Sequence, residues 1–440
     1  MSFKENLVRA RSHIVLIVAI LVSFAGVVAI ERNSPAVTPA AAAASPMPVE
    51  RSADSPALPG PRPLTDDERA WARIAWKYFV ANTQASTGLV NSVDGFPSST
   101  MWDTASYLLA MISAERLGLI GTDEFDRRMS AALDALARMP LFNGQLPNKS
   151  YDTRSLDMVD YTNRKTEGGI GWSAIDIGRL EVPFNILVWR YPRFTAAVDK
   201  VTRRWAMPAL ARNGELIGAA RTADKVVLQQ EGRLGYEQYA ARTLLLSGVD
   251  CAQAATWSTH LGFVDIYDVP VPTDTRTPAR YGAQNYVLSE PYMLQGLEFG
   301  LDGAAHEFAW RLLKVQRARY VATGQITAVT EDHLDRAPYF AYNTVYSGGK
   351  AWATVTDTGA DASASRSVST KAAFAWHALF RDDYTGKLVA FVRAANQPDK
   401  GWYAGIYEKT GQSNAALNAN TNGVILESLA YIERGPLLRF

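Results

Sequence analysis

Four short segments of this chain each combine a carboxyl group with aromatic residues at a position where a helix is expected to begin. They are Met101–Asp103, Gly171–Asp176, Gly235–Tyr239 and Ser289–Tyr292; Gly401–Glu408 has a similar composition but is expected to be a loop. The apolar faces of sugar rings stack on Trp and Tyr, and glycosidic bonds are cleaved by paired carboxyl groups. If these segments meet in one cavity, that cavity is suited to carbohydrate.

Glu290 is the first candidate for the proton donor of such a site. It precedes Pro291, a residue suited to the first turn of a helix, so Glu290 is expected at or beside the N-cap. Glycoside hydrolysis also needs a second carboxylate, which activates water or attacks the anomeric carbon. Asp103 or Glu237 is the predicted partner, with Glu408 in reserve. The sequence leaves open whether the hydrolysis would be inverting or retaining.

Other aromatic and polar residues of these segments are predicted to contact the sugar. They are Trp102, Trp172, Asp176, Tyr236, Tyr239, Tyr292, Trp402, Tyr403, Asn420 and Asn422. The polar stretch 331–333 is expected at the rim of the same cavity. A plainer reading exists for several of these residues, because acids in a first turn complement the helix dipole and asparagine is a common N-cap.

The composition excludes several other classes of function. The 440 residues include 45 basic and 44 acidic ones, so there is no electrostatic signature of nucleic-acid binding. A single cysteine, Cys251, cannot form an internal disulfide or a cysteine-based metal cluster. The five histidines lack metal-ligand spacing. We therefore expect no cofactor and no transition metal, whereas calcium held by carboxylates stays open.

The N-terminal region has the pattern of a targeting element. Lys4, Arg9 and Arg11 precede an apolar or small run over residues 14–30, which Glu31 and Arg32 close. Residues 1–32 are predicted to be a membrane anchor whose basic side stays in the cytoplasm. The following domain would then be periplasmic and tethered to the inner membrane, or secreted if the segment is cleaved.

Residues 33–63 are rich in Pro, Ala and Ser and predict a disordered tether, so that the folded domain would span residues 64–440. Thr65 and Glu68 predict a capping box at the first helix of that domain. Twelve helices are expected, over 66–83, 102–118, 122–139, 172–190, 194–211, 236–248, 251–258, 288–301, 303–323, 369–381, 383–395 and 420–433.

Every second helix, beginning with the one at 102, starts in a segment rich in Trp, Tyr, Asn or acids. Six such helices alternating with six ordinary amphipathic ones predict an all-α fold, an (α/α)6 toroid whose inner helices open into one funnel. Long polar loops over 140–171, 212–235, 259–287 and 324–368 would form the rim of that funnel.

Six segments carry a resemblance to a known group of proteins: Trp102–Ser106, Gly169–Glu181, Gly235–Tyr239, Ser289–Tyr292, Gly401–Glu408 and Asn418–Asn422. From about Arg69 to Arg434 the chain resembles a bacterial family of exported domains of unknown function. That family is distantly similar to the glucoamylase-like domains of β-1,2-glucan enzymes. The resemblance implies an (α/α)6 fold and a glycan-facing cleft, but it transfers no catalytic pair.

Together these patterns predict an exported glycoside hydrolase that acts on a glucan or another exopolysaccharide. A second hypothesis is a non-catalytic glycan-binding component of a polysaccharide synthesis or secretion assembly, with proteins of that assembly as partners. A third is a polysaccharide lyase or sugar epimerase. It would be favoured by a basic cleft lined by Arg233, Arg280 or Arg336.

Overall fold

The computed structural model describes residues 49–222, 225–281 and 284–438. Its α-helices are α3 (Asp66–Asn82), α4 (Met101–Arg116), α5 (Thr122–Arg138), α6 (Ala174–Arg190), α7 (Thr195–Thr202), α8 (Tyr236–Leu246), α9 (Ala252–Ala255), α10 (Pro278–Tyr281), α11 (Glu290–Phe299), α12 (Gly303–Thr323), α13 (Thr370–Phe380), α14 (Asp383–Val392) and α15 (Ala419–Arg434). The predicted anchor and most of the predicted tether lie outside the described residues.

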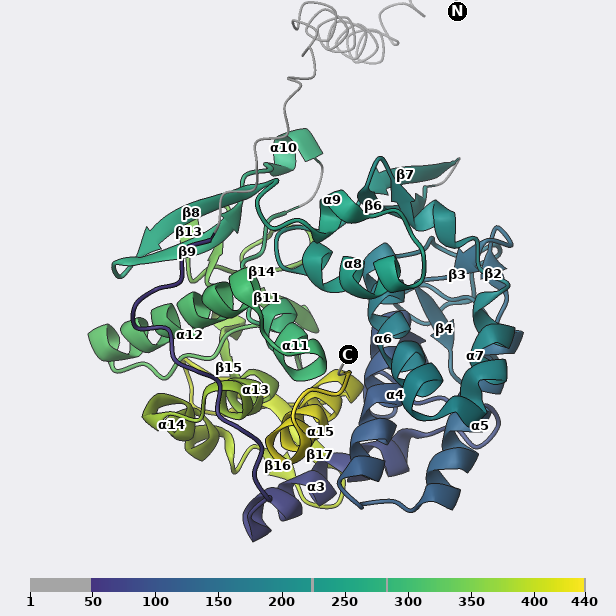
Figure 1. The fold of residues 1–440 in the computed structure, drawn as a ribbon, viewed down its shortest axis with the longest axis horizontal. Coiled ribbons are helices and arrows are strands. Elements are labelled where there is room, and N and C mark those ends of the chain that lie inside the picture. Colours follow the sequence, from purple (N-terminus) through teal and green to yellow (C-terminus); the bar gives the residue numbers. More distant parts are fainter. Residues whose placement is uncertain (1–48, 223–224, 282–283, 439–440) are drawn as a thin grey trace, which may run out of the picture. The chain divides into compact units, whose positions relative to one another are not determined.

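Six helices form a closed inner ring. Going round it, α4 contacts α6, α6 contacts α8, α8 contacts α11, α11 contacts α13, α13 contacts α15, and α15 returns to α4. Figure 1 shows this ring around the C-terminal end of the chain, with α3, α5, α7, α12 and α14 at the periphery. Each outer helix packs on an inner one, for example α14 on α13 and α3 on α15. This arrangement agrees with the predicted (α/α)6 toroid.

The predicted starts of the inner helices lie within two residues of the observed ones. The sequence predicted 102, 172, 236, 288, 369 and 420, and the helices begin at 101, 174, 236, 290, 370 and 419. Two outer helices are much shorter than expected. The predicted helix over 194–211 is α7 followed by a 3-10 turn at Met207–Leu210, and α9 has four residues.

The description "all-α" is too narrow, because the loops at the inner-helix starts contain small antiparallel sheets. Their strands are β1 (Ser98–Thr100), β2 (Leu141–Phe142), β3 (Leu146–Pro147), β4 (Ser150–Asp152), β5 (Ala211–Arg212), β6 (Glu215–Arg221), β7 (Val226–Gln230), β8 (Leu261–Ile266), β9 (Val269–Asp274), β10 (Glu331–His333), β11 (Phe340–Asn343), β12 (Tyr346–Ser347), β13 (Lys350–Ala351), β14 (Thr354–Val355), β15 (Ser367–Ser369), β16 (Asn396–Gln397), β17 (Gly401–Tyr407) and β18 (Ser413–Leu417).

These sheets pair β1 with β4, β2 with β3, β8 with β9, and β12 with β13, and they join β5–β6–β7, β10–β11–β14 and β15–β17–β16, with β18 also on β17. The hairpin β8–β9 turns through Tyr267 and Asp268, both with positive φ. Two positive φ angles are typical of a two-residue hairpin turn. Tyr-Asp is not a usual sequence for that turn, so the hairpin was not predicted.

Side-chain caps fix where the inner helices begin. Thr100 caps α4 by accepting the backbone N–H of Asp103 at 3.0 Å, and Ser173 caps α6 by accepting that of Asp176 at 3.1 Å. Asn418 caps α15 in the same way. In α11, Glu290 is the first helical residue and Pro291 follows it, as predicted. The predicted capping box of Thr65 and Glu68 is confirmed at α3.

Residues 49–63, which their composition placed in the tether, contain no helix or strand and run along the folded domain (Figure 1). We call them the strap. Ser52 donates its backbone N–H to Glu307 at 2.9 Å, and Asp54 pairs with Lys314 at 2.6 Å. Val49 and Leu58 pack against the core. In the described part of the chain, no helix has both the length and the apolar content needed to cross a bilayer.

Candidate functional site

Carboxyl groups gather where the inner helices begin. Asp103 lies in the first turn of α4, Asp176 in that of α6 and Glu290 in that of α11, while Glu231 precedes α8 and Glu331 and Asp332 lie on β10. Their charges act on one another: Glu231 and Asp103 on Asp176, and Glu290 and Asp176 on Glu331. We call these six residues the carboxyl cluster.

Glu290 is the most deeply buried member of the cluster. Its side chain is fully buried and forms an ion pair with Lys371 of α13, with Nζ 2.6 Å from Oε2. Asn420 of α15 donates to the other carboxylate oxygen at 2.7 Å, and the Thr330 hydroxyl lies 3.2 Å from Oε2. Burial lowers the pKa of Lys371, but the charges of Glu290, Asp332 and Glu331 outweigh it and raise that pKa. Lys371 therefore stays protonated beside Glu290.

Successive side chains of β10 point to opposite faces of the strand, which separates its two acids. Glu331 and His333 are partly exposed, whereas Asp332 between them is buried. Burial and then the charge of Glu290 raise the pKa of Glu331 to about 7, against the lowering effects of Lys371 and the Tyr236 hydroxyl. Burial also raises the pKa of Asp332 well above its ordinary value. At neutral pH, Glu331 is thus close to half protonated.

Asp176 and Glu231 form a second acidic pair. Glu231 accepts the backbone N–H of Ala174 at 2.6 Å, so its carboxylate occupies the N-terminus of α6, where negative charge is favoured. Burial, then the charge of Glu231, raises the pKa of the partly exposed Asp176 to about 7, although Lys149 lowers it. Burial raises the pKa of Glu231 as well. Asp176 and Glu331 are therefore both partly exposed and able to donate a proton near neutrality.

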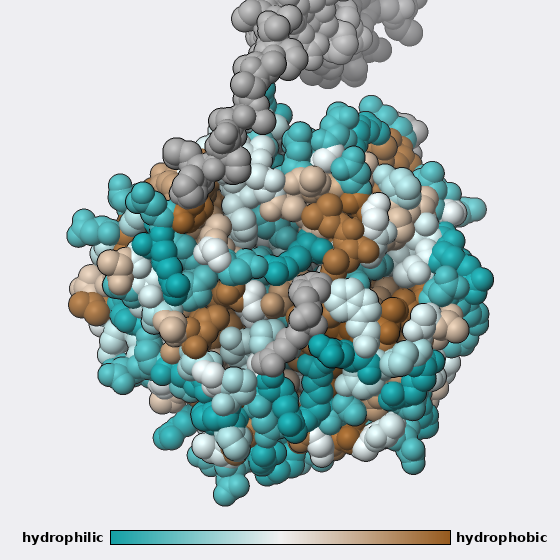
Figure 2. Space-filling model, viewed as in Figure 1, coloured by the Kyte–Doolittle hydropathy of each residue, from teal (hydrophilic) through white to brown (hydrophobic). Residues whose placement is uncertain are grey.

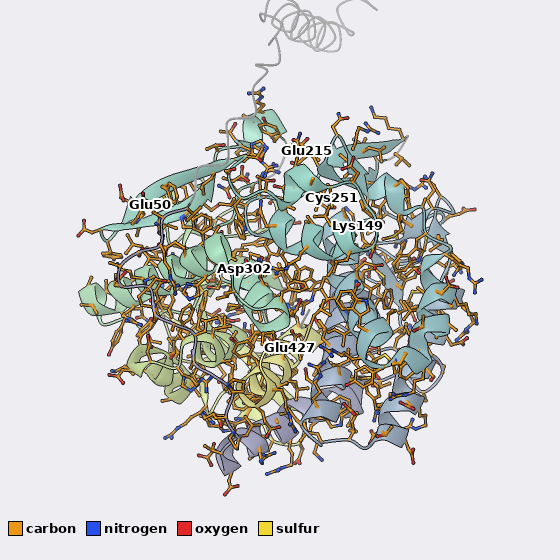
Figure 3. The ribbon with its side chains drawn as sticks, viewed as in Figure 1. Glu50, Lys149, Glu215, Cys251, Asp302 and Glu427 are labelled. Carbon is orange, nitrogen blue, oxygen red and sulfur yellow. The ribbon has the colours of Figure 1, made fainter. Side chains whose placement is uncertain are left out.

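A buried ion network supports the cluster from inside the ring. The fully buried Arg179 of α6 contacts Glu298 of α11 at 2.9 Å and Glu427 of α15 at 3.3 Å. Tyr239 of α8 lies 3.0 Å from the same guanidinium. Figure 3 labels Glu427 near the middle of the ring. The guanidinium carbon of Arg179 lies 4.6 Å from the ring centre of Trp102, so this network holds one face of a partly exposed tryptophan.

Tyrosines from three loops lie around the acids. Tyr286 and Tyr342 stack with ring centres 4.1 Å apart. Burial raises the pKa of both hydroxyl groups, and the charge of Glu331 adds to that rise. Tyr161 raises the pKa of Tyr342 further. The charges of Asp176 and Glu231 act in turn on the hydroxyl group of Tyr161, which is 64% exposed. These rings offer flat apolar surfaces beside the two titrating carboxyl groups.

Two other predicted catalytic residues form ion pairs with arginine. Glu237 forms a short ion pair with Arg276, which also binds Asp274. Burial raises the pKa of Glu237, although Arg276 lowers it. Glu408 accepts two hydrogen bonds from Arg319, at 2.6 and 2.9 Å. The catalytic roles of Glu237 and Glu408 stay predictions.

Of the residues predicted to contact sugar, Trp102, Asp176, Tyr236 and Asn420 lie at the cluster. The others are packed into the protein. Trp172 and Trp402 are buried and donate their ring N–H groups to Ile217 and Trp71, and Tyr292 stacks on Trp257. Asn422 holds the backbone of Trp402, Tyr239 belongs to the ion network, and Tyr403 packs against the core.

Sequence reasoning missed Glu231, Lys149 and Lys371, and assigned Glu331 and Asp332 only to the rim. Lys371 had a usable signal, because it follows Thr370 at the start of an inner helix. Glu231 directly precedes Gly232, whose φ is +94°, in the loop that enters α8. Lys149 lies beside β4 in a loop and carried no signal of its own.

The sequence model of one protein family, described as "Protein of unknown function (DUF3131)", matches residues 70–435. No curated protein matches the chain. Among solved structures, a glucoamylase candidate from Bacteroides fragilis has a TM-score of 0.63 at 13% identity, covering 86% of this chain and 93% of its own.

Two further structures share the fold. The endo-β-1,2-glucanase from Chitinophaga pinensis, solved with sophorotriose and glucose, has a TM-score of 0.61 at 11% identity and covers 85% of this chain and 94% of its own. The β-1,2-glucanase from Parabacteroides distasonis has a TM-score of 0.59 at 10% identity, covering 85% of this chain and 58% of its own. At such identities the likeness concerns the fold alone.

Proposed function

The chain belongs to the DUF3131 family of proteins of unknown function, so its activity must be inferred from the site, and we propose that it hydrolyses glycosidic bonds in a glycan. One observation carries the proposal. Asp176 and Glu331 are partly exposed, the charge of Asp176 acts on Glu331, and burial raises the pKa of both to about 7. At neutral pH one of them can be protonated while the other is ionised, which is the state that acid–base hydrolysis of a glycoside needs.

The assignment of roles follows from exposure. Glu290 is fully buried and ion-paired, so we give it a positioning role: its charge helps to raise the pKa of Glu331. Trp102 and Tyr236 are partly exposed beside the acids and would stack on sugar rings, as would Tyr161. We propose a glucan or exopolysaccharide as substrate, acted on outside the cytoplasm by a protein tethered through residues 1–32.

The test is the release of reducing ends from a panel of linear glucans by the full-length protein. The panel contains β-1,2-, β-1,3-, β-1,4- and α-1,4-linked chains, with the β-1,2-linked chain first because two proteins of the same fold act on it. Asp176→Asn and Glu331→Gln should each lower kcat by about 10²- to 10⁴-fold, since each removes a proton-transfer group. The profile of kcat/KM against pH should be bell-shaped and centred near pH 7.

Matched controls are Asp199→Asn and Glu124→Gln on the outer helices, which change the same residue types in exposed ion pairs. They should leave the rate unchanged. Hydrolysis that survives both cluster substitutions would refute the assignment of Asp176 and Glu331. Binding of a glycan with no turnover by any form would instead favour the non-catalytic glycan-binding component.

A further inference from the structure

We propose that the glycan carries free amino groups and that the carboxyl cluster binds the ammonium group of a hexosamine residue. This inference names the substrate class of the proposed function and therefore rests on it. The class includes polymers of hexosamine from which some or all N-acetyl groups have been removed. Three features of the cluster support it: its charge, an unfilled hydrogen-bond acceptor, and the position of the arginines.

The charge of the cluster is strongly unbalanced. Its six carboxyl groups face two ammonium groups, those of Lys149 and Lys371, and the partly exposed imidazole of His333. Lys371 is already engaged with Glu290 at 2.6 Å and lies 4.0 Å from Asp332. The N-termini of the inner helices add partial positive charge. Burial first, and then the charges of Glu231 and Glu290, raise the pKa of Asp176 and Glu331, so a cation beside them would favour their ionised forms.

One hydrogen-bond acceptor at the cluster is unfilled. Asn420, whose amide nitrogen donates to Glu290, has no donor for its Oδ1 among the described residues. Its side chain is more than nine-tenths buried, with 6% exposed. An ammonium group supplies three donors and no acceptor. It therefore matches the unfilled amide oxygen as well as the surrounding carboxyl groups.

An acidic glycan fits this site poorly. A uronate would need guanidinium groups near the sugar, but the three arginines predicted for that task are engaged elsewhere. Arg336 stacks on Tyr407 at 3.7 Å, Arg280 lies over Tyr281, and Arg233 donates to Gln230. A neutral glycan would leave the charges of the cluster uncompensated. A cationic sugar compensates them.

Binding can be measured by isothermal titration calorimetry on the full-length protein at pH 7. The probes are tetramers of β-1,4-linked glucosamine, N-acetylglucosamine and glucose, which share length and linkage. The glucosamine tetramer should bind at least about tenfold more tightly than the other two, because the ammonium group gains Coulomb energy beside several carboxylates. Raising the NaCl concentration from about 0.05 to 0.5 M should remove most of this preference.

Two variants that change the charge of the cluster in opposite directions distinguish an electrostatic effect from a structural one. Asp176→Asn should weaken binding of the glucosamine tetramer. Lys149→Met removes a competing ammonium group beside Asp176 and should tighten it by about threefold to tenfold. Neither change should alter the preference between the two uncharged tetramers. A merely structural disturbance would weaken binding in both variants.

Equal or tighter binding of an uncharged tetramer, or weaker glucosamine binding in Lys149→Met, would overturn the inference. If a neutral glucan is also cleaved in an Asp176-dependent way, the proposed function survives while the amino-sugar assignment falls. If no tetramer binds and no glucan is cleaved, both fail together.

Discussion

At the scale of single residues, the partner of each carboxyl group decides what it can do. Glu237 and Glu408 form ion pairs with arginine, and Glu290 forms one with Lys371. Asp176 and Glu331 have no such direct ion pair among the described residues, and burial raises the pKa of both to about 7. Burial raises the pKa of Glu237 too, but there Arg276 opposes it. Glu181 shows the same behaviour away from the cluster. It is 4% exposed, accepts a hydrogen bond from Ser247 at 2.6 Å, and burial raises its pKa to about 7.

Glu181 makes a prediction about stability. Its pKa is raised from 4.5 to about 7 on folding, so the native state binds the extra proton and the free energy of unfolding falls as pH rises through this window. Above pH 7 the loss amounts to about 3 kcal/mol. Glu181→Gln should therefore be more stable than the wild type at pH 8 and about equal to it at pH 5. Urea unfolding at both pH values checks this.

The control for that measurement is Glu124→Gln on the surface of α5, which should shift stability little at either pH. A stability gain of Glu181→Gln that is the same at pH 5 and pH 8 would show that Glu181 does not titrate in this window.

Asp176 and Glu237 illustrate why the sequence could place acids at the inner-helix starts but could not assign their partners. Both are acids in the first turn of an inner helix, so the sequence pattern does not distinguish them. Arg276 separates their roles, and it reaches Glu237 from the end of the β8–β9 hairpin. Lys371 likewise reaches Glu290 from another helix. Such partners are set by tertiary contacts, which local spacing does not contain.

At the scale of elements, segments rich in Trp, Tyr, Asn or acidic residues made the inner helices predictable, whereas the hairpins carried no comparable signal. In the structure, Thr100, Ser173 and Asn418 cap three of these helices. The strands are short, and their pairing depends on loops of unlike composition. One tight helix contact within the ring is equally hidden: a Cβ at Gly178 of α6 would lie 2.6 Å from that of Ala240 in α8.

Gly178→Ala should therefore destabilise the protein by about 1–3 kcal/mol, because α6 and α8 must move apart to accept the added methyl group. Thermal and urea unfolding measure the change. The matched control is Gly386→Ala in α14, where a Cβ would meet nothing within 4 Å. That change should stabilise by about 0.5–1 kcal/mol through helix propensity. Equal effects of the two substitutions would contradict the close approach.

At the scale of the whole molecule, the ring is enclosed by outer helices and crossed on its outside by the strap. Much of the face in Figure 2 is hydrophilic, with apolar residues scattered between. The strap adds contacts to α12 through Ser52 and Asp54, and Arg62 binds Glu68 of α3 at 2.7 Å. Residues 49–63 therefore belong to the folded unit rather than to a tether.

A chain that begins at residue 64 should be less stable than one that begins at residue 49, by about 2–4 kcal/mol, since it loses buried apolar contacts and hydrogen bonds to Glu307. Differential scanning calorimetry would measure the two. Glu307→Gln should cost more in the longer chain than in the shorter one, because only the longer chain contains Ser52. Additive effects would argue against the strap contact.

The closure of α15 on α4 has a consequence for how the chain acquires its structure. The last inner helix, α15, packs against the first, α4. It also contributes Glu427, which pairs with Arg179, and Asn420, which donates to Glu290. A nascent chain that ends before residue 419 exposes the flanks of α4 and α13 and leaves a buried guanidinium short of one partner. Folding is thus expected to be completed late, after synthesis of nearly the entire chain. A chain that terminates anywhere before α15 should be degraded by proteases and should not be partly active.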